Sequence, residues 1–208
     1  TGEILFWLNS DDIVLPGAFQ VVAETFTANP EVSIVSGQAL IINEIGERIG
    51  TLKSYFNSWD ELVTNPGNSV RQISTFFRRK IFDECGMVDE SLYIAMDTEL
   101  MVRLTKYNIP IIINDHLAAF RKQNNAKTFY AFGKQYLESD RNRLKYFNNK
   151  KQARKYHQRS SKNWLSLSQS KRSSNKQRFF CVVQALKIQP SIILERRFVS
   201  TLRQIWFG

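Results

Sequence analysis

An apolar run followed by two adjacent carboxylates is the feature that most constrains how this chain can fold. Residues 4–8 (ILFWL) are apolar without interruption, and Asp11 and Asp12 follow shortly after them. A short continuous apolar run predicts a strand that is covered on both faces, as in a parallel sheet. Ligands of open α/β sheets bind at the carboxyl ends of the strands. The two aspartates are therefore candidate site residues.

The aspartate pair has two interpretations. Adjacent like charges repel each other, and a divalent cation such as Mg²⁺ or Mn²⁺, which prefers oxygen ligands, would relieve that repulsion and in turn hold a diphosphate. The alternative is a turn in which the Asp side chains accept hydrogen bonds from nearby backbone N–H groups. The pair alone leaves both interpretations open.

The two halves of the chain carry opposite charge. The formal net charge is +10, but residues 1–120 have 8 Lys and Arg against 16 Asp and Glu, whereas residues 121–208 have 21 against 3. Such asymmetry predicts two regions with different roles, which we expect at residues 1–125 and, as a basic helical extension, at residues 126–208. The basic region suits phosphates or an anionic membrane surface.

Cysteine content and hydropathy bear on the compartment. Cys85 and Cys181 lie far apart, without CxxC spacing or partner histidines, which argues against a disulfide framework or a zinc site and favours a reducing, cytoplasmic compartment. No stretch reaches the roughly 18 apolar residues of a membrane span, and no signal-peptide pattern opens the chain. Because the chain enters a core strand at once, we expect it to be a piece of a longer protein whose upstream strands precede it.

Periodicity predicts alternating strands and helices in the acidic half, the pattern of an α/β layer structure. Strands are expected at residues 4–8, 32–36, 38–43, 48–52, 69–77 and 109–114, and helices from Pro16 to Asn29, at 54–63, at 79–85 and after Asp97. In the basic half we expect helical segments at 129–137, 143–159, 179–188 and 192–207. Residues 160–175 predict a loop or hinge around a helical turn at 164–167.

Three stretches form a joint pattern. They are LNSDDIVLPGAF (residues 8–19), ISTFFRRKIFDECGMVDESL (residues 73–92) and AMDTELMVRL (residues 95–104). In content, order and spacing they resemble the family-two inverting glycosyltransferases of the GT-A fold, over roughly residues 1–128. The resemblance implies an incomplete GT-A sheet with flanking helices, and transfer of a sugar from a nucleotide-diphosphate donor to an acceptor hydroxyl in cell-surface polysaccharide or glycolipid synthesis.

The resemblance also implies roles for the acidic residues. Asp12 would be the main ligand of Mg²⁺ or Mn²⁺, with Asp11 supporting it or meeting the sugar nucleotide. Asp97 would be the base that takes the proton of the acceptor hydroxyl; the alternative is a helix N-cap, and the two roles can coexist. Two positions depart from the family pattern: Met96 stands where a Glu often precedes the base, and Gln123 stands where a His often lies near the metal.

Five further positions are candidates with ordinary structural alternatives. Gly86, Asp89 and Glu90 match the loop of the family that approaches donor sugar and acceptor, and the alternative is a helix-terminating glycine followed by a polar turn. Arg121 matches an arginine that reaches phosphate, against an exposed arginine. Gln72 would face the acceptor, against a solvated strand edge.

The C-terminal stretch 191–207 predicts a basic amphipathic helix with Leu194, Phe198, Leu202 and Ile205 on one side. Such a helix either lies on an anionic bilayer, where each nearby Lys or Arg adds about 1 kcal/mol, or packs on the catalytic half or another subunit. The expected partners are a nucleotide-sugar donor and a saccharide or lipid-linked acceptor, with peripheral contact at the cytoplasmic membrane face as a hypothesis. The alternative class is a nucleic-acid-binding or non-catalytic interaction protein that uses the basic tail, although the acidic half would repel nucleic acid.

Overall fold

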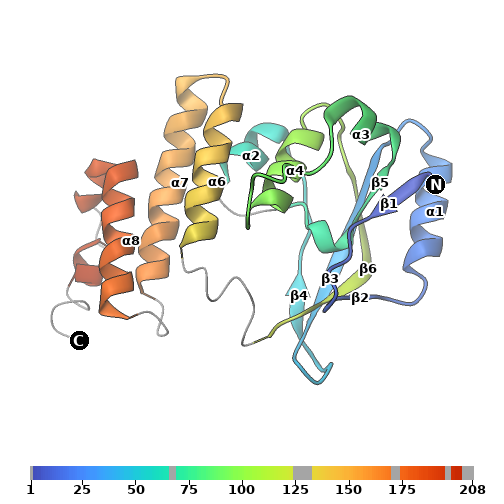
Figure 1. Ribbon diagram of the computed structural model, residues 1–208, viewed down its shortest axis with the longest axis horizontal. Coiled ribbons are helices and arrows are strands. Elements are labelled where there is room, and N and C mark those ends of the chain that lie inside the picture. Colours follow the sequence, from blue (N-terminus) through green and yellow to red (C-terminus); the bar gives the residue numbers. More distant parts are fainter. Residues whose placement is uncertain (1, 66–68, 124–132, 170–173, 195–197, 203–208) are drawn as a thin grey trace. The chain divides into compact units, whose positions relative to one another are not determined.

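The computed structural model describes residues 2–65, 69–123, 133–169, 174–194 and 198–202 (Figure 1). Contacts divide the chain into two compact units, one of residues 1–62 with 67–130 and the other of residues 63–66 with 131–208. We call them the sheet unit and the helical unit. The boundary that we expected after residue 125 falls within residues 124–132, outside the described residues.

The sheet unit is built on a six-stranded mixed sheet. Its order is β1-β5-β3-β6-β2, with β4 paired to β3. β3 and β6 are parallel, and the remaining pairs are antiparallel. The strands are β1 (Ile4–Phe6), β2 (Ile13–Val14), β3 (Ile34–Ile42), β4 (Arg48–Leu52), β5 (Thr75–Arg78) and β6 (Ile111–Arg121). The helical elements between them are α1 (Ala18–Ala28), α2 (Trp59–Thr64), the 3₁₀ turn η1 (Gln72–Ser74), α3 (Lys80–Cys85) and α4 (Met96–Leu104). The expected α/β class is confirmed.

The first strand is shorter than expected and differently paired. β1 ends at Phe6, its residues are half-buried, and it runs antiparallel to β5. The expectation of a strand covered on both faces in a parallel sheet is therefore wrong here. The Phe6 ring stacks on Phe76, with 4.2 Å between the ring centroids. The next residue, Trp7, leaves the sheet because its carbonyl accepts a hydrogen bond from the Gln72 side chain.

β3 is one strand where two were predicted on either side of Gly37. The register of β3 against β6 shifts between Ser36 and Gln38, so Gly37 lies at an irregularity of the ladder. A Cβ atom at Gly37 would lie 2.5 Å from Cγ of Leu117 and 2.7 Å from the carbonyl oxygen of Asp115. A glycine inside a strand marks such a close approach of backbones. The strand therefore continues through Gly37 because only a residue without a side chain fits against β6.

Helix α1 covers the sheet with the apolar stripe that the sequence predicts (Figure 1). Gly17, with a φ of 80°, precedes its first residue, and Asn29 caps its end. The buried side chains Ala18, Val22 and Phe26 pack in one cluster with residues of β3, β5 and β6. The predicted helix between Pro16 and Asn29-Pro30 is thus confirmed, as is the predicted strand that forms β4.

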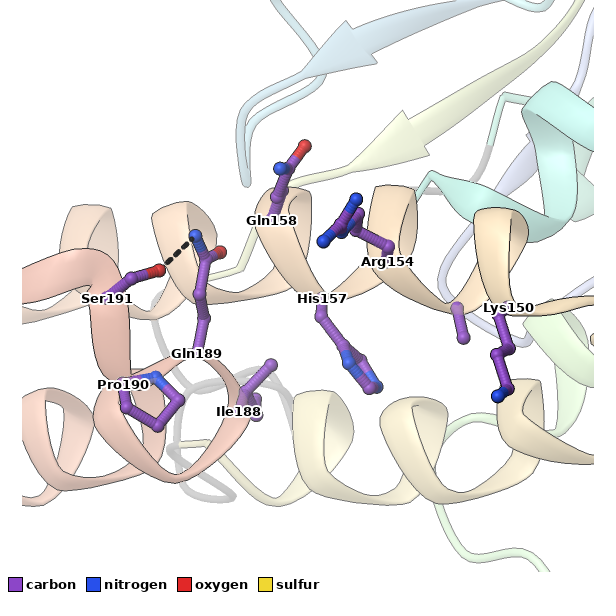
Figure 2. A pocket seen from close by; sticks show the side chains of 9 residues that line it. Lys150, Arg154, His157, Gln158, Ile188, Gln189, Pro190 and Ser191 are labelled. Carbon is purple, nitrogen blue, oxygen red and sulfur yellow. Dashed lines mark hydrogen bonds between the residues drawn. The ribbon is translucent and has the colours of Figure 1, made fainter.

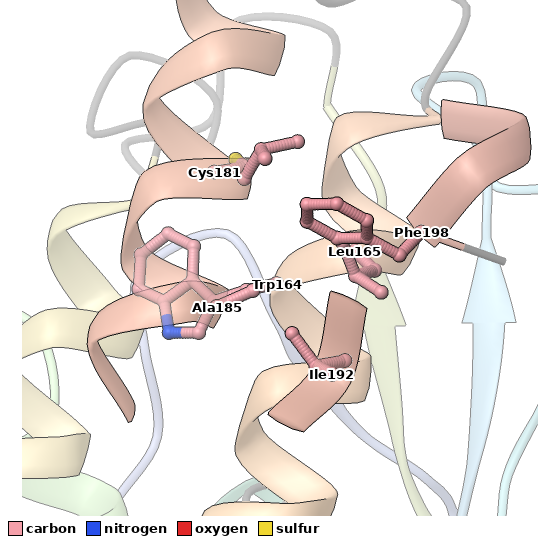
Figure 3. Close-up of a cluster of buried hydrophobic side chains, with 7 residues drawn as sticks. Trp164, Leu165, Cys181, Ala185, Ile192 and Phe198 are labelled. Carbon is pink, nitrogen blue, oxygen red and sulfur yellow. The ribbon is translucent and has the colours of Figure 1, made fainter. Parts of the chain in front are cut away.

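The described helices of the helical unit, including a short helical segment at residues 198–202, pack around an apolar core (Figure 3). The described elements are α6 (Lys134–Arg143), the 3₁₀ turn η2 (Leu144–Tyr146), α7 (Lys150–Ser168), α8 (Asn175–Ile188) and the 3₁₀ turn η3 (Pro190–Leu194). Trp164 and Leu165 of α7 are fully buried against Cys181 and Ala185 of α8. The loop or hinge expected from residue 160 is therefore wrong up to Ser168, because burial of Trp164 extends the helix through a polar, serine-rich stretch. The helical turn expected at 164–167 lies within this helix.

The remaining expectations for the basic half also change. The helix expected over 143–159 is divided, since α6 ends at Arg143 and α7 begins after Asn149, whose side chain accepts a hydrogen bond from the backbone N–H of Gln152 at 2.9 Å. The C-terminal stripe is not one face of a single helix: Leu194 is 84 % exposed, whereas Phe198 is 7 % exposed and lies in the core. Phe129, Phe132 and Ile205 lie outside the described residues.

None of the described helices has the length and apolar character that crossing a bilayer requires.

Candidate functional site

One edge of the sheet collects most of the predicted site residues. β1, β3 and β6 end at this edge, and the antiparallel strands β2 and β5 begin there. Asp11 and Asp12 directly precede β2, Gln72 lies in the turn before β5, and Arg121 and Gln123 lie at and after the end of β6. The aspartates thus belong to a loop that enters the sheet again, not to the end of the first strand as we expected.

Asp12 is a buried carboxylate held by neutral donors. Asp12 is only 8 % exposed to solvent. Oδ1 accepts a hydrogen bond from the backbone N–H of Arg121 at 3.1 Å, and Oδ2 accepts one from the side-chain amide of Asn9 at 2.9 Å. Burial raises the pKa of Asp12, the two hydrogen bonds lower it, and the charge of Asp11 raises it, with a net increase. Burial thus disfavours the charged form, and the Arg121 charge offsets this only in part.

Asp11 is half-buried beside its neighbour. Its Oδ2 accepts a hydrogen bond from the side-chain amide of Gln123 at 3.2 Å. Gln123 had entered only as a departure from the family pattern, and Asn9 had not been considered. The signal for Gln123 is its place two residues after Arg121, whereas the signal for Asn9 is an amide three residues before the buried carboxylate, at the start of the turn.

Arg121 holds the loop that carries the aspartates. Its guanidinium donates to the carbonyl oxygen of Asp11 at 3.2 Å and to those of Asn43 and Glu44, at the end of β3, at 3.3 and 3.0 Å. The simple alternative of a solvent-exposed arginine is therefore wrong. The predicted role at phosphate stays a prediction, and the contacts show a side chain that positions the loop.

Gln72 contacts the segment that leads into the same loop. The residue is buried, and its side-chain amide donates to the carbonyl of Trp7, in the segment between β1 and the aspartates. The alternative of a solvated strand edge is wrong for this residue, because its amide replaces the missing strand partner of Trp7. Contact of Gln72 with an acceptor remains a prediction.

Asp97 lies in the first turn of α4. The N-cap of this helix is Ala95, which provides no side-chain cap, so the N-cap alternative for Asp97 is wrong. The Asp97 carboxylate accepts a hydrogen bond from the backbone N–H of Thr98 at 2.7 Å. Placement of a carboxylate in the first turn is favoured by the helix dipole.

Arg71 lies close enough to Asp97 for the two charges to interact. Burial lowers the pKa of the Arg71 guanidinium, and the nearby Tyr55 and Asp97 act in the opposite direction. Arg71 directly precedes Gln72, which is bonded to the segment that leads to the aspartate pair. The charge of Asp97 thus acts on a residue next to η1, and Gln72 of η1 contacts the segment that precedes the aspartate pair.

The loop that follows α3 is tied to α4. Gly86 ends α3 with a φ of 79°, as the structural alternative for this glycine predicts. The Arg103 guanidinium donates to the carbonyl oxygens of Gly86 and Met87 at 2.8 and 2.7 Å and pairs with Glu99, with Nε 2.8 Å from Oε1. The loop is thereby held by the helix that bears Asp97.

The last two candidates lie further along this loop. Asp89 accepts a hydrogen bond from the backbone N–H of Ser91 at 3.0 Å, the geometry of an Asx turn. Glu90 is exposed. These contacts explain Asp89 as a turn residue, and the predicted approach of the loop to donor and acceptor stays a prediction.

The aspartate pair fits a hard divalent cation. Each Asp12 oxygen accepts one hydrogen bond, and an ionised carboxylate has about four acceptor positions. Mg²⁺ commonly binds through one or two carboxylates and retains several waters. Within the described ranges, no group of three or more His, Cys, Asp and Glu side chains is arranged to hold a metal. The remaining ligands would then be waters, the diphosphate or a neutral oxygen such as that of the Gln123 amide.

In comparisons with known proteins, no family model matches this chain and no curated protein matches it.

Proposed function

We propose that this chain is part of an inverting glycosyltransferase that moves a sugar from a nucleotide-diphosphate donor to an acceptor hydroxyl, and that its sheet unit is an incomplete GT-A domain. The observation that carries the proposal is the buried Asp12 carboxylate beside Asp11 at the edge of the sheet. Burying a charged carboxylate costs free energy unless it is paired or binds a metal. A turn aspartate would explain the bond to Asn9, but not the burial or the adjacent like charge.

The aspartate pair serves the departure of the nucleoside diphosphate. Negative charge gathers on the diphosphate as the bond to the sugar breaks. Asp12 and Asp11 would hold a divalent cation, which would supply positive charge to stabilise this transition state. The backbone N–H of Arg121 donates to the Asp12 carboxylate, and the Gln123 amide donates to the Asp11 carboxylate, so each carboxylate is held by a donor at or just after the end of β6. A preorganised pair loses little energy to rearrangement during the reaction.

Asp97 serves the attacking hydroxyl. As general base it accepts the proton of the acceptor hydroxyl while the oxygen attacks the sugar from the face opposite the leaving group. A single displacement of this kind inverts the anomeric centre. The base must be held in place, and it lies on α4, which is fixed by two contacts. The indole N–H of Trp59 donates to the carbonyl of Val102 at 2.8 Å, and Arg103 joins the helix to the preceding loop. A saccharide or a lipid-linked acceptor fits this scheme, in polysaccharide or glycolipid synthesis.

The experiment is a transfer and donor-hydrolysis assay on the protein at its full natural length. A panel of nucleotide-diphosphate sugars is tested with Mn²⁺ or Mg²⁺ against Asp12→Asn, Asp97→Asn and the control Asp83→Asn, which changes an exposed carboxylate on α3. We expect Asp12→Asn to lower metal-dependent turnover by about 100-fold or more. We expect Asp97→Asn to retain donor binding and to lose transfer by a similar factor.

The control separates a site effect from the loss of one negative charge. Asp83→Asn should keep full activity. Full activity of both site variants, or equal losses in all three variants, would reject the assignment. Direct titration of Mn²⁺, followed by its electron paramagnetic resonance signal, provides a readout besides activity: Asp12→Asn should weaken Mn²⁺ binding, and Asp97→Asn should not.

A further inference from the structure

The helical unit contains a cavity of about 510 Å³ between α7 and the turn that follows α8 (Figure 2). Small-molecule sites in proteins have volumes of about 300–1,000 Å³. None of the candidate glycosyltransferase residues lines this cavity, so the proposed sugar transfer does not account for it.

Three basic side chains line one side of the cavity. Lys150, Arg154 and His157 come from successive turns of α7, a spacing that places them on one face of the helix. Lys150 and Arg154 are exposed. Among the described residues, neither has a carboxylate within ion-pair distance. The cavity therefore gathers positive charge that no described side chain neutralises.

The helical unit has too few acidic residues to neutralise the positive charge of the cavity. Residues 131–208 contain only Glu138, Asp140 and Glu195. Asp140 accepts hydrogen bonds from Ser160 at 2.8 Å and from the Trp164 indole at 3.0 Å, and neither of those residues lines the cavity. Glu195 lies outside the described residues.

The opposite side of the cavity supplies a neutral donor. The Gln189 side chain is fixed at both ends. Its oxygen accepts from the hydroxyl of Ser161 at 3.0 Å, and its amide donates to the hydroxyl oxygen of Ser191 at 3.2 Å (Figure 2). Because the Ser191 oxygen is the acceptor there, its own proton is available for an anion. Ile188 and Pro190 add an apolar wall beside it.

We propose that this cavity binds a phosphate ester. Lys150, Arg154 and His157 would contact the phosphate oxygens, Ser191 would donate a further hydrogen bond, and the apolar wall would take the organic group. Hydrogen bonds from charged donors to phosphate are about twice as strong as neutral ones. This site does not depend on the glycosyltransferase proposal. The ester is either a soluble metabolite or the headgroup of an anionic lipid, which share this chemistry.

The test is an NMR titration of the chain with glycerol 3-phosphate. The protein has two histidines, so the ring signals of His157 report on the cavity and those of His116, in β6, serve as an internal control. We expect the His157 signals to shift while those of His116 stay unchanged. The double variant Lys150→Gln/Arg154→Gln should weaken binding by about tenfold or more. The control pair Lys151→Gln/Lys176→Gln, exposed residues that do not line the cavity, removes the same charge and should weaken it less than twofold.

A second arm identifies the source of the ester. Vesicles that contain phosphatidic acid are compared with vesicles of phosphatidylcholine alone, in sedimentation at physiological salt. Sedimentation with phosphatidic acid that the cavity variant loses assigns a lipid headgroup, whereas binding of glycerol 3-phosphate without sedimentation assigns a soluble ester. Absence of any shift at His157, or equal weakening by the cavity and control pairs, would overturn the proposal.

Discussion

Two carboxylates, Asp140 in the helical unit and Asp12 in the sheet unit, both accept hydrogen bonds within the fold but differ in what else surrounds them. In the helical unit, Asp140 of α6 accepts hydrogen bonds from the Tyr156, Ser160 and Trp164 side chains of α7. In the sheet unit, Asp12 accepts from a side-chain amide and from the backbone of Arg121, and a second carboxylate adjoins it. Asp140 therefore joins two helices, whereas Asp12 sits beside a like charge that a fold alone does not require.

The surroundings of Asp140 explain why it is structural. Burial, and then the neighbouring Asp140 charge, raise the pKa of the Tyr156 hydroxyl far above its ordinary value. The hydroxyl thus remains a donor at any physiological pH, and the three donors stay with one acceptor. A carboxylate saturated by donors from its own fold has little left to offer a ligand, and Asp12 lacks that saturation.

The largest effect should follow from removing the acceptor in the helical unit. Asp140→Ala leaves three donors without their partner and should lower the free energy of unfolding by about 3 kcal/mol. Asp140→Asn keeps one acceptor oxygen and should cost less. Hydrogen exchange followed by mass spectrometry should show faster exchange in α6, α7 and α8 and unchanged exchange in β3 and β6. Equal acceleration in both units would break the comparison.

A smaller decrease in the free energy of unfolding should follow from overpacking the sheet at Gly37. Gly37→Ala places a Cβ atom against Leu117 and the backbone of Asp115, and overpacking of this kind costs about 2 kcal/mol. The control Gly50→Ala, in β4, meets only the end of the flexible Ile41 side chain, at 3.3 Å, and should cost less. Urea unfolding of the two variants measures the difference. Similar losses would show that β3 does not approach β6 as closely as described.

Asp12→Asn should change the free energy of unfolding less than either of the preceding variants. Because the pKa of Asp12 is raised in the folded chain, the folded state holds a proton more tightly than the unfolded state. The contribution of Asp12 to the free energy of unfolding therefore falls as pH rises from about 4 through the raised pKa, and stays low above it. Asp12→Asn removes this loss, but it also turns one of the two accepting oxygens, which face Asn9 and the backbone N–H of Arg121, into an amide donor. The two effects oppose each other, so we expect the stability of the metal-free variant at pH 7 to differ from that of the natural chain by about 1 kcal/mol at most.

The same variant separates a binding carboxylate from a structural one. Millimolar Mn²⁺ should raise the melting temperature of the natural chain and leave that of Asp12→Asn unchanged, since a ligand stabilises only the folded state that binds it. Thermal unfolding at pH 4 to 8, with and without Mn²⁺, measures both effects. A variant far less stable than the natural chain at every pH would place Asp12 with Asp140 as a purely structural acceptor.

The smallest effect concerns the two thiols, one in each unit. Cys181 is fully buried, and burial raises the pKa of its thiol to about 12, whereas Cys85 is half-buried at the end of α3. Thiolates are the reactive form. At pH 8 a disulfide reagent should therefore label Cys85 first, and Cys85→Ser should remove this fast phase with little change in stability. Rapid labelling of Cys181 would indicate that the core of the helical unit opens readily.

Local patterns sufficed for part of this fold. The apolar spacing of α1 between Pro16 and Asn29, the strand β4 and the buried Leu100, Met101 and Leu104 of α4 follow from residues close in sequence. So does the edge position of Asp11 and Asp12, although they precede β2 instead of ending β1. The opposite charges of the two halves are likewise a property of the sequence.

The rest depends on contacts between residues far apart in the chain. The strand β3 continues through position 37 because glycine has no side chain to collide with Leu117. Helix α7 continues through Trp164 because this side chain is buried against Cys181 and Ala185. By itself the sequence determined which side chains could carry charge and where apolar faces recur. Only the tertiary structure decided which carboxylate would be saturated by donors and which would remain beside a like charge, because burial and donor geometry arise when distant segments pack.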